Sequence, residues 1–243
     1  MSTDQKQALS AHLKAIRRML IISVAAVAVL FVLFFYLLCG PLVDFVLAPV
    51  RARGIEVITT SVSEALMMQF KVCLIAAVIA GMPVIIWQIW VFVSPALYPQ
   101  EKRLFATLFF VALLLFVGGV VFCYCLVFPM AIDLFWSAAD GVASTLWSVK
   151  EYFNFVLSFV LPFGLMFELP VVVYMLARRG LVTYQKLAHS RKYVILVIAI
   201  IAAILTPPDA VSQCMLAIPM ILLYEVAAQL ARLVKPKKPA EAQ

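Results

Sequence analysis

Three runs of the chain each continue for more than 20 residues without a charged side chain, and they limit its possible folds more than any other feature. They cover residues 19–39, 72–100 and 104–132. A helix needs about 20 apolar residues to cross the hydrocarbon core of a bilayer, and in lipid the backbone must satisfy its own hydrogen bonds. Of the 243 residues, only 13% are charged and 66% are hydrophobic, whereas soluble proteins are about a quarter charged. The sequence therefore predicts an all-α, polytopic membrane protein.

Three further apolar segments complete the predicted set of six spans. Residues 150–177 are long enough to cross a bilayer, and residues 210–224 follow a turn at 206–209. The segment 193–205 has only 13 residues, which is about 20 Å of helix against a hydrocarbon core of about 30 Å. Two interpretations remain open for this last pair: short spans that need a thinner bilayer, or a re-entrant hairpin.

The polar segments between the spans predict which side of the membrane each connection occupies. Residues 40–64 and 133–148 are expected to form external loops, and residues 94–103 a cytoplasmic connection. Of the 19 Lys and Arg residues, 15 lie in segments assigned to the cytoplasm and four in the others. This bias is what the positive-inside rule requires for both termini in the cytoplasm.

The N-terminal segment ends in Arg17 and Arg18 directly before the first apolar run, which is a pattern shared with export signals. Signal cores usually have about 7–15 apolar residues, and the 21-residue run here ends at Gly40 and Pro41 without a clear cleavage site. We predict an uncleaved first span. The chain is then one integral membrane domain, residues 1–243, with a cytoplasmic segment 1–18, a membrane region 19–231 and a basic cytoplasmic tail 232–243.

The sequence contains no motif that would indicate catalysis or a cofactor. Metalloprotease, serine hydrolase, phosphate-loop and dinucleotide-binding signatures are all missing, and the two histidines lie in polar cytoplasmic segments. The five cysteines lack metal-ligand spacing and are interpreted as free thiols. The net charge of +7 accompanies apolar runs, so it is assigned to membrane orientation and not to nucleic acid. We expect no enzyme, no cofactor and no bound metal.

One acid, Glu168, lies inside an apolar segment of the fourth predicted span. An acid at the centre of a spanning helix costs roughly 2.5–3.5 kcal/mol, so it should face protein or water. On a helical wheel Gly164 and Asn154 fall within about 40° of it, which predicts a polar stripe facing inward or towards a partner. Pro162 and Pro170 are expected to kink the helix. A plain alternative is a protonated acid making one structural hydrogen bond between helices.

Several motifs together resemble the TatC family, the multispanning subunits of the twin-arginine, or Sec-independent, protein translocase. The resemblance covers nearly the full length and rests on these stretches: His12-Leu13 with Arg17, Ala48-Pro49, Ser63-Glu64-Ala65, residues 90–98 (WVFVSPALY), Glu101-Lys102-Arg103, residues 167–170 (FELP), residues 205–209 (LTPPD) and Ser212-Gln213. It implies six tilted helices cupped around a concave face, with short fifth and sixth helices and both termini cytoplasmic. It also implies a bacterial cytoplasmic (inner) membrane location.

The family's function implies three groups of residues in this chain. A surface that binds twin-arginine signal peptides of folded cargo would include Arg17, Phe92, Pro95, Leu97, Tyr98 and Glu101. A surface for single-span TatA-like and TatB-like subunits would include Glu168, Thr206 and Gln213. External-loop structure would depend on Pro49, Glu64 and Asp209. The resemblance further implies a hetero-oligomer with several copies in the lipid bilayer and transport driven by the proton gradient.

One position departs from the family pattern. The family has a Glu shortly before its first arginine, in the form HLxELR, and here Ala15 occupies that place. One of two carboxylates expected to meet the signal arginines is therefore missing, which shifts the expected pairing to Glu101. The later arginine of the pattern is Met19, with Arg18 beside it.

A different class of function also fits a membrane-embedded acid. Glu168 would carry a proton in an ion-coupled transporter of small solutes. The halves of the chain show no inverted repeat, which is a common feature of such transporters.

Overall fold

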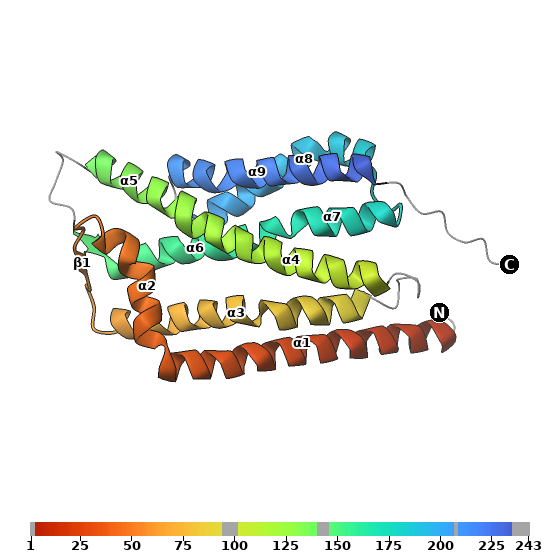
Figure 1. Ribbon diagram of the computed structural model, residues 1–243, viewed down its shortest axis with the longest axis horizontal. Helices are drawn as coiled ribbons and strands as arrows, with labels where there is room; N and C mark the ends of the chain where they lie inside the picture. Colours follow the sequence, from red (N-terminus) through yellow and green to blue (C-terminus); the bar gives the residue numbers. More distant parts are fainter. Residues whose placement is uncertain (1–2, 94–101, 140–145, 207–208, 235–243) are drawn as a thin grey trace. The chain divides into compact units, whose positions relative to one another are not determined.

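The computed structural model describes residues 3–93, 102–139, 146–206 and 209–234 (Figure 1). The chain forms two compact units. Unit 1 comprises Met1–Ala52 and Thr59–Leu113, and unit 2 comprises Arg53–Ile58 and Leu114–Gln243. The prediction of a single membrane domain stays a prediction.

Unit 1 is built on two long helices, α1 (Thr3–Leu37) and α3 (Glu64–Val93), which lie side by side in opposite directions (Figure 1). A Cβ atom on Gly81 of α3 would lie 3.2 Å from Val27 Cγ2 of α1, so the helices pack closely there. This antiparallel packing brings the beginning of α1 to the end of α3.

Part of the predicted first external loop is helical. α2 (Cys39–Arg51) occupies its first portion, with Leu47 and Val50 buried. Pro41 lies in the first turn of α2, where backbone N–H groups have no partner within the helix. The charged residues of this segment predicted that it lies outside the lipid. They are also compatible with an amphipathic helix, which is what α2 is.

The third predicted span is one path made of three pieces: α4 (Lys102–Phe122), a π-helical turn over Cys123–Val127, and α5 (Phe128–Ala139). Phe128 N–H donates to Cys123 O, five residues back. The next residue, Pro129, has no N–H, and its ring would clash with the carbonyl four residues earlier. The wider turn accommodates this proline inside an apolar segment.

The fourth predicted span is interrupted once. It consists of α6 (Val149–Phe167) and α7 (Leu169–Arg178), with Glu168 between them. Phe153, Phe159 and Phe163 of α6 are almost fully buried and supply much of the core of unit 2.

The last two helices are longer than their apolar runs. α8 covers Tyr184–Leu205 and α9 covers Ala210–Leu233, with 22 and 24 residues. At 1.5 Å per residue they measure about 33 and 36 Å, which is enough to cross a hydrocarbon core. The extensions carry Arg191 of α8 and Glu225 of α9, which pair with each other, with Nη2–Oε1 and Nε–Oε2 distances of 2.6 and 3.0 Å. They remain the shortest of the candidate spans within the described residues.

Residues 53–58 belong to unit 2 although their neighbours in sequence belong to unit 1. Strand β1 (Val57–Ile58) pairs in parallel with β2 (Trp147–Ser148). Arg53 binds both oxygens of Asp133 in α5, with Nε–Oδ1 and Nη2–Oδ2 distances of 2.5 and 3.1 Å. Its hydrogen bond to Asp133 raises the pKa of Arg53.

Within the described residues, six helical segments are long and apolar enough to cross a membrane. They are Leu13–Leu37, Glu64–Phe92, Ala106–Ser137, Val149–Arg178, Tyr184–Leu205 and Ala210–Leu233. The predicted all-α fold with six spans is confirmed.

Candidate functional site

Glu168 lies where the backbone of the fourth span changes from one helix to the next. Its N–H donates to Leu165 O at 3.1 Å, and Val171 N–H donates to Glu168 O at 3.0 Å, so both bonds span three residues instead of four. Pro170 is in the first turn of α7 and has no N–H to continue the regular pattern. The break occurs beside Pro170, whereas Pro162 lies within α6 without ending it.

The Glu168 side chain is half-buried, and one of its two oxygens has an unusual position. Oε1 is inaccessible to solvent and has no hydrogen-bond partner among the described residues. A buried polar atom without a partner costs about 1–3 kcal/mol. A carboxyl group can accept hydrogen bonds, or donate one when protonated. The junction therefore presents a polar group whose bonding capacity is unused.

The junction is supported by close contact between α4 and α6. A Cβ atom on Gly119 would lie 2.8 Å from the carbonyl oxygen of Phe163 and 2.8 Å from Phe167 Cγ. The ring of Phe122 lies 5.7 and 5.6 Å from the rings of Phe163 and Phe167, between centroids. These contacts hold the end of α6 against α4, immediately before the carboxylate.

The polar stripe expected beside Glu168 is not open along its length. Gly164 is buried, and a Cβ atom there would lie 2.6 Å from Cε2 of Phe116 in α4. Asn154 is half-buried, and its backbone carbonyl oxygen accepts a hydrogen bond from the Ser158 hydroxyl at 2.8 Å. The stripe faces protein of the same chain at Gly164, because a glycine there admits the Phe116 ring.

Thr206 and Gln213 lie in the α8–α9 hairpin, and both use their polar groups within it. Thr206 is 6% exposed and donates its hydroxyl to Ala202 O at 2.9 Å. Gln213 donates its side-chain amide to Ala199 O at 3.0 Å. The hydrogen bonds of the described residues do not join either side chain to Glu168. The three residues that the resemblance grouped are thus divided between the α6–α7 junction and the hairpin.

The three residues predicted to organise the external loops lie at helix ends or in a helix. Glu64 begins α3 and accepts hydrogen bonds from the N–H and hydroxyl of Thr60 at 2.7 and 2.6 Å. Asp209 caps α9, with Oδ1 accepting from Ser212 N–H at 2.7 Å. Pro49 lies within α2.

Of the residues expected to bind signal peptides, two are described. Arg17 is exposed on α1, and Phe92 is half-buried in the last turn of α3. Both belong to unit 1, where the start of α1 lies beside the end of α3. Pro95, Leu97, Tyr98 and Glu101 fall outside the described residues.

Two ion pairs between residues far apart in the chain were not identified from the sequence. Arg191 and Glu225 lie almost the same number of residues before and after the turn between α8 and α9, which is the spacing that an antiparallel hairpin brings together. The sequence therefore contained a signal for the Arg191–Glu225 pair. Arg53 and Asp133 are 80 residues apart in different predicted loops, and local pattern carries no signal for their contact.

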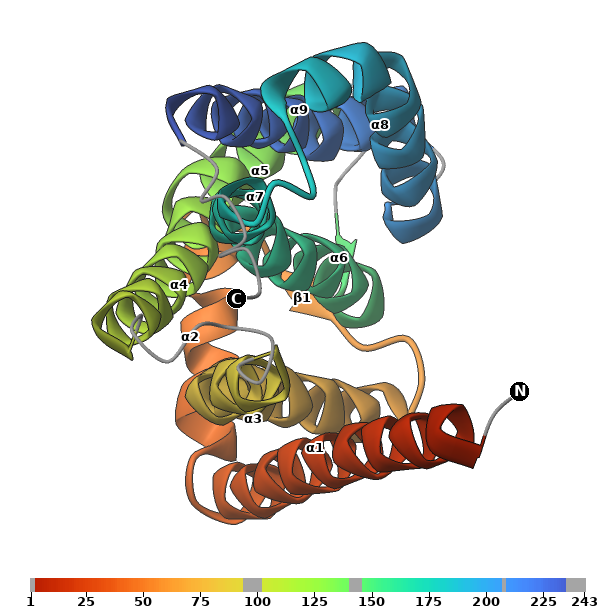
Figure 2. The same ribbon diagram turned by 90° about the vertical axis from the view of Figure 1, so that its right-hand side faces the viewer.

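The fold and the Glu168 junction together define the class of protein to which this chain belongs. This is a six-span helical membrane protein with a carboxylate held at a helix break inside a span. Figure 1 shows α6 and α7 following one another end to end, and Figure 2 shows α9 beside α8.

Comparison with known proteins assigns the family. The model of the Sec-independent protein translocase protein TatC matches residues 11–219. A TatC of Carboxydothermus hydrogenoformans is 39% identical over 236 residues, covering 97% of both chains. A TatC of Haemophilus influenzae is 35% identical over 239 residues, covering 97% of this chain and 93% of that one. The chain belongs to the TatC family, and so it is a component of a Sec-independent, or twin-arginine, protein translocase.

A solved structure shows the same fold. A crystal structure described as the twin arginine translocase receptor TatC superimposes with a TM-score of 0.86 and 37% identity, covering 91% of this chain and 98% of that chain. The family assignment therefore rests on both sequence and fold, and it gives no support to the small-solute transporter.

Proposed function

We propose that this chain is the receptor subunit of the translocase, without enzymatic activity of its own. It binds twin-arginine signal peptides of folded proteins and assembles with single-span TatA-like and TatB-like subunits in a bacterial cytoplasmic membrane. Both termini lie in the cytoplasm. A solved relative whose description names it a receptor supports this proposal, as does the excess of Lys and Arg in the predicted cytoplasmic segments.

The observation that carries the assembly proposal is the half-buried side chain of Glu168, whose Oε1 has no hydrogen-bond partner among the described residues. A polar side chain on the spanning helix of another subunit would bond to this carboxyl group once the Glu168 side chain rotates to expose Oε1, and interhelical hydrogen bonds in lipid contribute about 0.6 to 2 kcal/mol each. Glu168 lies at the helix break beside Pro170 and is half-buried, so its side chain is not enclosed.

Glu168→Ala is expected to abolish assembly with a single-span subunit, because it removes the group that the partner helix meets. Glu168→Gln should retain part of the complex, since an amide still forms hydrogen bonds. Native gel electrophoresis after detergent extraction measures both. Glu56→Ala, which removes an exposed carboxylate of the 53–58 segment, is the matched control and should assemble normally. An intact complex with Glu168→Ala would assign Glu168 to structure alone.

The signal-peptide surface is proposed to lie where α1 begins and α3 ends. Arg17 is exposed there, and Glu101 follows α3 in sequence. A carboxylate binds a guanidinium group through two parallel hydrogen bonds, which lysine cannot reproduce. With Ala15 in place of the family glutamate, Glu101 is proposed to carry the main pairing with a signal arginine.

Glu101→Ala is therefore expected to abolish photo-crosslinking of a twin-arginine signal peptide to this protein in membranes. A signal with two lysines should crosslink poorly to the unmodified protein for the same reason. Glu56→Ala is again the control, because it changes the net charge equally at a distant point in the sequence. Unchanged crosslinking with Glu101→Ala would reject the role of Glu101.

A further inference from the structure

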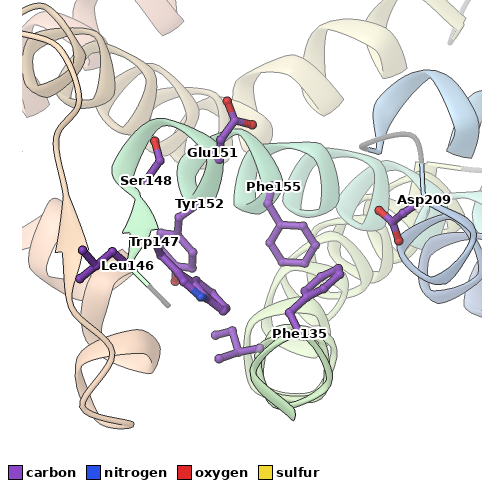
Figure 3. A pocket seen from close by; sticks show the side chains of 9 residues that line it. Phe135, Leu146, Trp147, Ser148, Glu151, Tyr152, Phe155 and Asp209 are labelled. Carbon is purple, nitrogen blue, oxygen red and sulfur yellow. The ribbon is translucent and has the colours of Figure 1, made fainter. Parts of the chain in front are cut away.

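Unit 2 contains an open pocket of about 370 Å³ at the end where α6 begins. Its walls come from α5, β2, the first turns of α6, and the residue before α9 (Figure 3). The lining residues are Ile132, Phe135, Leu146, Trp147, Ser148, Glu151, Tyr152, Phe155 and Asp209. None of the roles proposed above for signal or partner binding uses this pocket.

Aromatic side chains form most of its wall. The rings of Phe135 and Phe155 meet edge to face, 5.7 Å apart at 87°. Trp147 lies 6.3 Å from Tyr152, at 42°. Figure 3 shows the rings of Phe135, Trp147 and Phe155 on the same side of α6. Tyr152 and Phe155 are at most 9% exposed, so the wall is held in place by packing.

The two charged residues among the described residues that line the pocket, Glu151 and Asp209, are both carboxylates. The Asp209 carboxylate lies towards the aromatic rings in Figure 3, whereas that of Glu151 points away from them, at the rim. Asp209 Oδ1 accepts the Ser212 N–H at 2.7 Å, and its second oxygen has no hydrogen bond within the described residues. Aromatic faces attract cations, and they do so more strongly where water is partly excluded. The pocket thus combines two kinds of group that favour positive charge.

We infer that this pocket binds an organic ammonium cation, with the charged nitrogen against the aromatic rings and near Asp209. A divalent metal does not fit as well, because calcium takes six to eight oxygen ligands. The described residues hold no group of three or more side chains able to bind a metal. The ammonium group could belong to a water-soluble compound or to the headgroup of an aminophospholipid.

A matched pair of probes tests the role of the charge. Choline and 3,3-dimethylbutan-1-ol have the same shape, with nitrogen in one replaced by carbon in the other. Both are titrated against the purified full-length chain in an uncharged maltoside detergent, by calorimetry and by tryptophan fluorescence. Choline is expected to bind saturably and about tenfold more tightly than the alcohol. Equal affinity for the two, or no saturable binding of choline, would overturn the inference.

Two substitutions locate the site. Asp209→Asn removes the charge but keeps a side-chain oxygen at the helix cap, where Asn is as effective as Asp. It should weaken choline binding about five- to tenfold. Glu56→Gln removes a carboxylate from a residue that does not line the pocket and should leave binding unchanged. Wild-type affinity in Asp209→Asn, or an equal loss in Glu56→Gln, would show that the pocket does not recognise the cation.

The source of the ligand is assigned by bilayer composition. The chain is placed in nanodiscs of phosphatidylethanolamine or of a neutral glycolipid, and choline is titrated into each. A lower apparent affinity in phosphatidylethanolamine supports the site and assigns it to a lipid headgroup, because the headgroup competes. Equal affinity in the two supports the site and assigns it to a water-soluble cation.

Discussion

At the scale of single residues, two adjacent glycines in α4 have different surroundings. A Cβ atom on Gly119 would lie 2.8 Å from the backbone oxygen of Phe163, whereas one on Gly118 would have no neighbour within 4 Å. Real Cβ atoms do not approach a backbone atom so closely, and a backbone oxygen cannot rotate away. Gly119 is required by the approach of α6, and Gly118 is not.

Gly119→Ala is expected to lower the free energy of unfolding by about 1–3 kcal/mol, because the extra methyl group overpacks the α4–α6 contact. Gly118→Ala is the control, and its expected effect is neutral or up to about 1 kcal/mol stabilising, since alanine favours helix. Thermal and denaturant unfolding in detergent compare the two. Equal destabilisation by both would contradict the assigned contact. Because Gly119 lies beside the Glu168 junction, partner assembly should weaken only in the first variant.

Glu168 itself shows the limit of single-residue reasoning. Its presence in an apolar segment predicted a functional or structural acid, and Pro170 predicted a helix kink. The helical wheel also grouped it with Gly164, which is instead covered by Phe116. A helical wheel describes one straight helix by itself, so it cannot show that the Phe116 ring of α4 lies against Gly164.

At the scale of elements, the lengths of the apolar runs did not predict two features of the helices: the π-helical turn before Pro129 and the full lengths of α8 and α9. Pro129 is accommodated by a π-helical turn, so α4 and α5 continue as one path. α8 and α9 continue beyond their apolar runs into segments that carry the Arg191–Glu225 pair. In the first case the backbone N–H of Phe128 finds an acceptor five residues back, at Cys123 O. In the second case two charged side chains find each other on neighbouring helices. Neither partner can be identified from the length of an apolar run.

The 53–58 segment is the element whose attachment is easiest to test. Arg53 holds it to Asp133, and Trp147 N–H donates to Glu56 O at 3.2 Å. Asp133 is 63% exposed, so water screens the ion pair and its contribution to stability is small. The segment is therefore expected to open locally more often than the helices of unit 2.

Arg53→Ala should increase amide hydrogen exchange in the peptides around residues 53–58 and 147–148, by up to about fivefold. The helical peptides of α6 should keep their wild-type exchange. The matched control is Arg51→Ala, which removes an exposed ion pair with Asp44 inside α2. Exchange at residues 147–148 should stay at the wild-type level in this control. An increase in both variants would mean that general charge, and not this pair, holds the segment.

At the scale of the whole molecule, the number and order of the spans follow from hydropathy, and the family follows from motifs spread along nearly the whole chain. The family match and the TM-score of 0.86 agree with that assignment. The side of the membrane reached by each connection rests on the distribution of Lys and Arg. Hydropathy cannot divide the spans between units, because lipid-facing and protein-facing helices are both apolar.

The sequence by itself determined that six helices are long and apolar enough to cross a membrane, the approximate limits of the second, third and fourth of them, and that an acid lies within the fourth. These properties depend on the transfer of individual side chains between water and lipid, which is a local quantity. Only the tertiary structure decided that Oε1 of Glu168 is buried without a partner among the described residues, that Gly164 is covered, and that Asp209 shares a pocket with Trp147. Each of these depends on contacts between residues far apart in the chain. A local sequence pattern does not indicate which distant side chain will make such a contact.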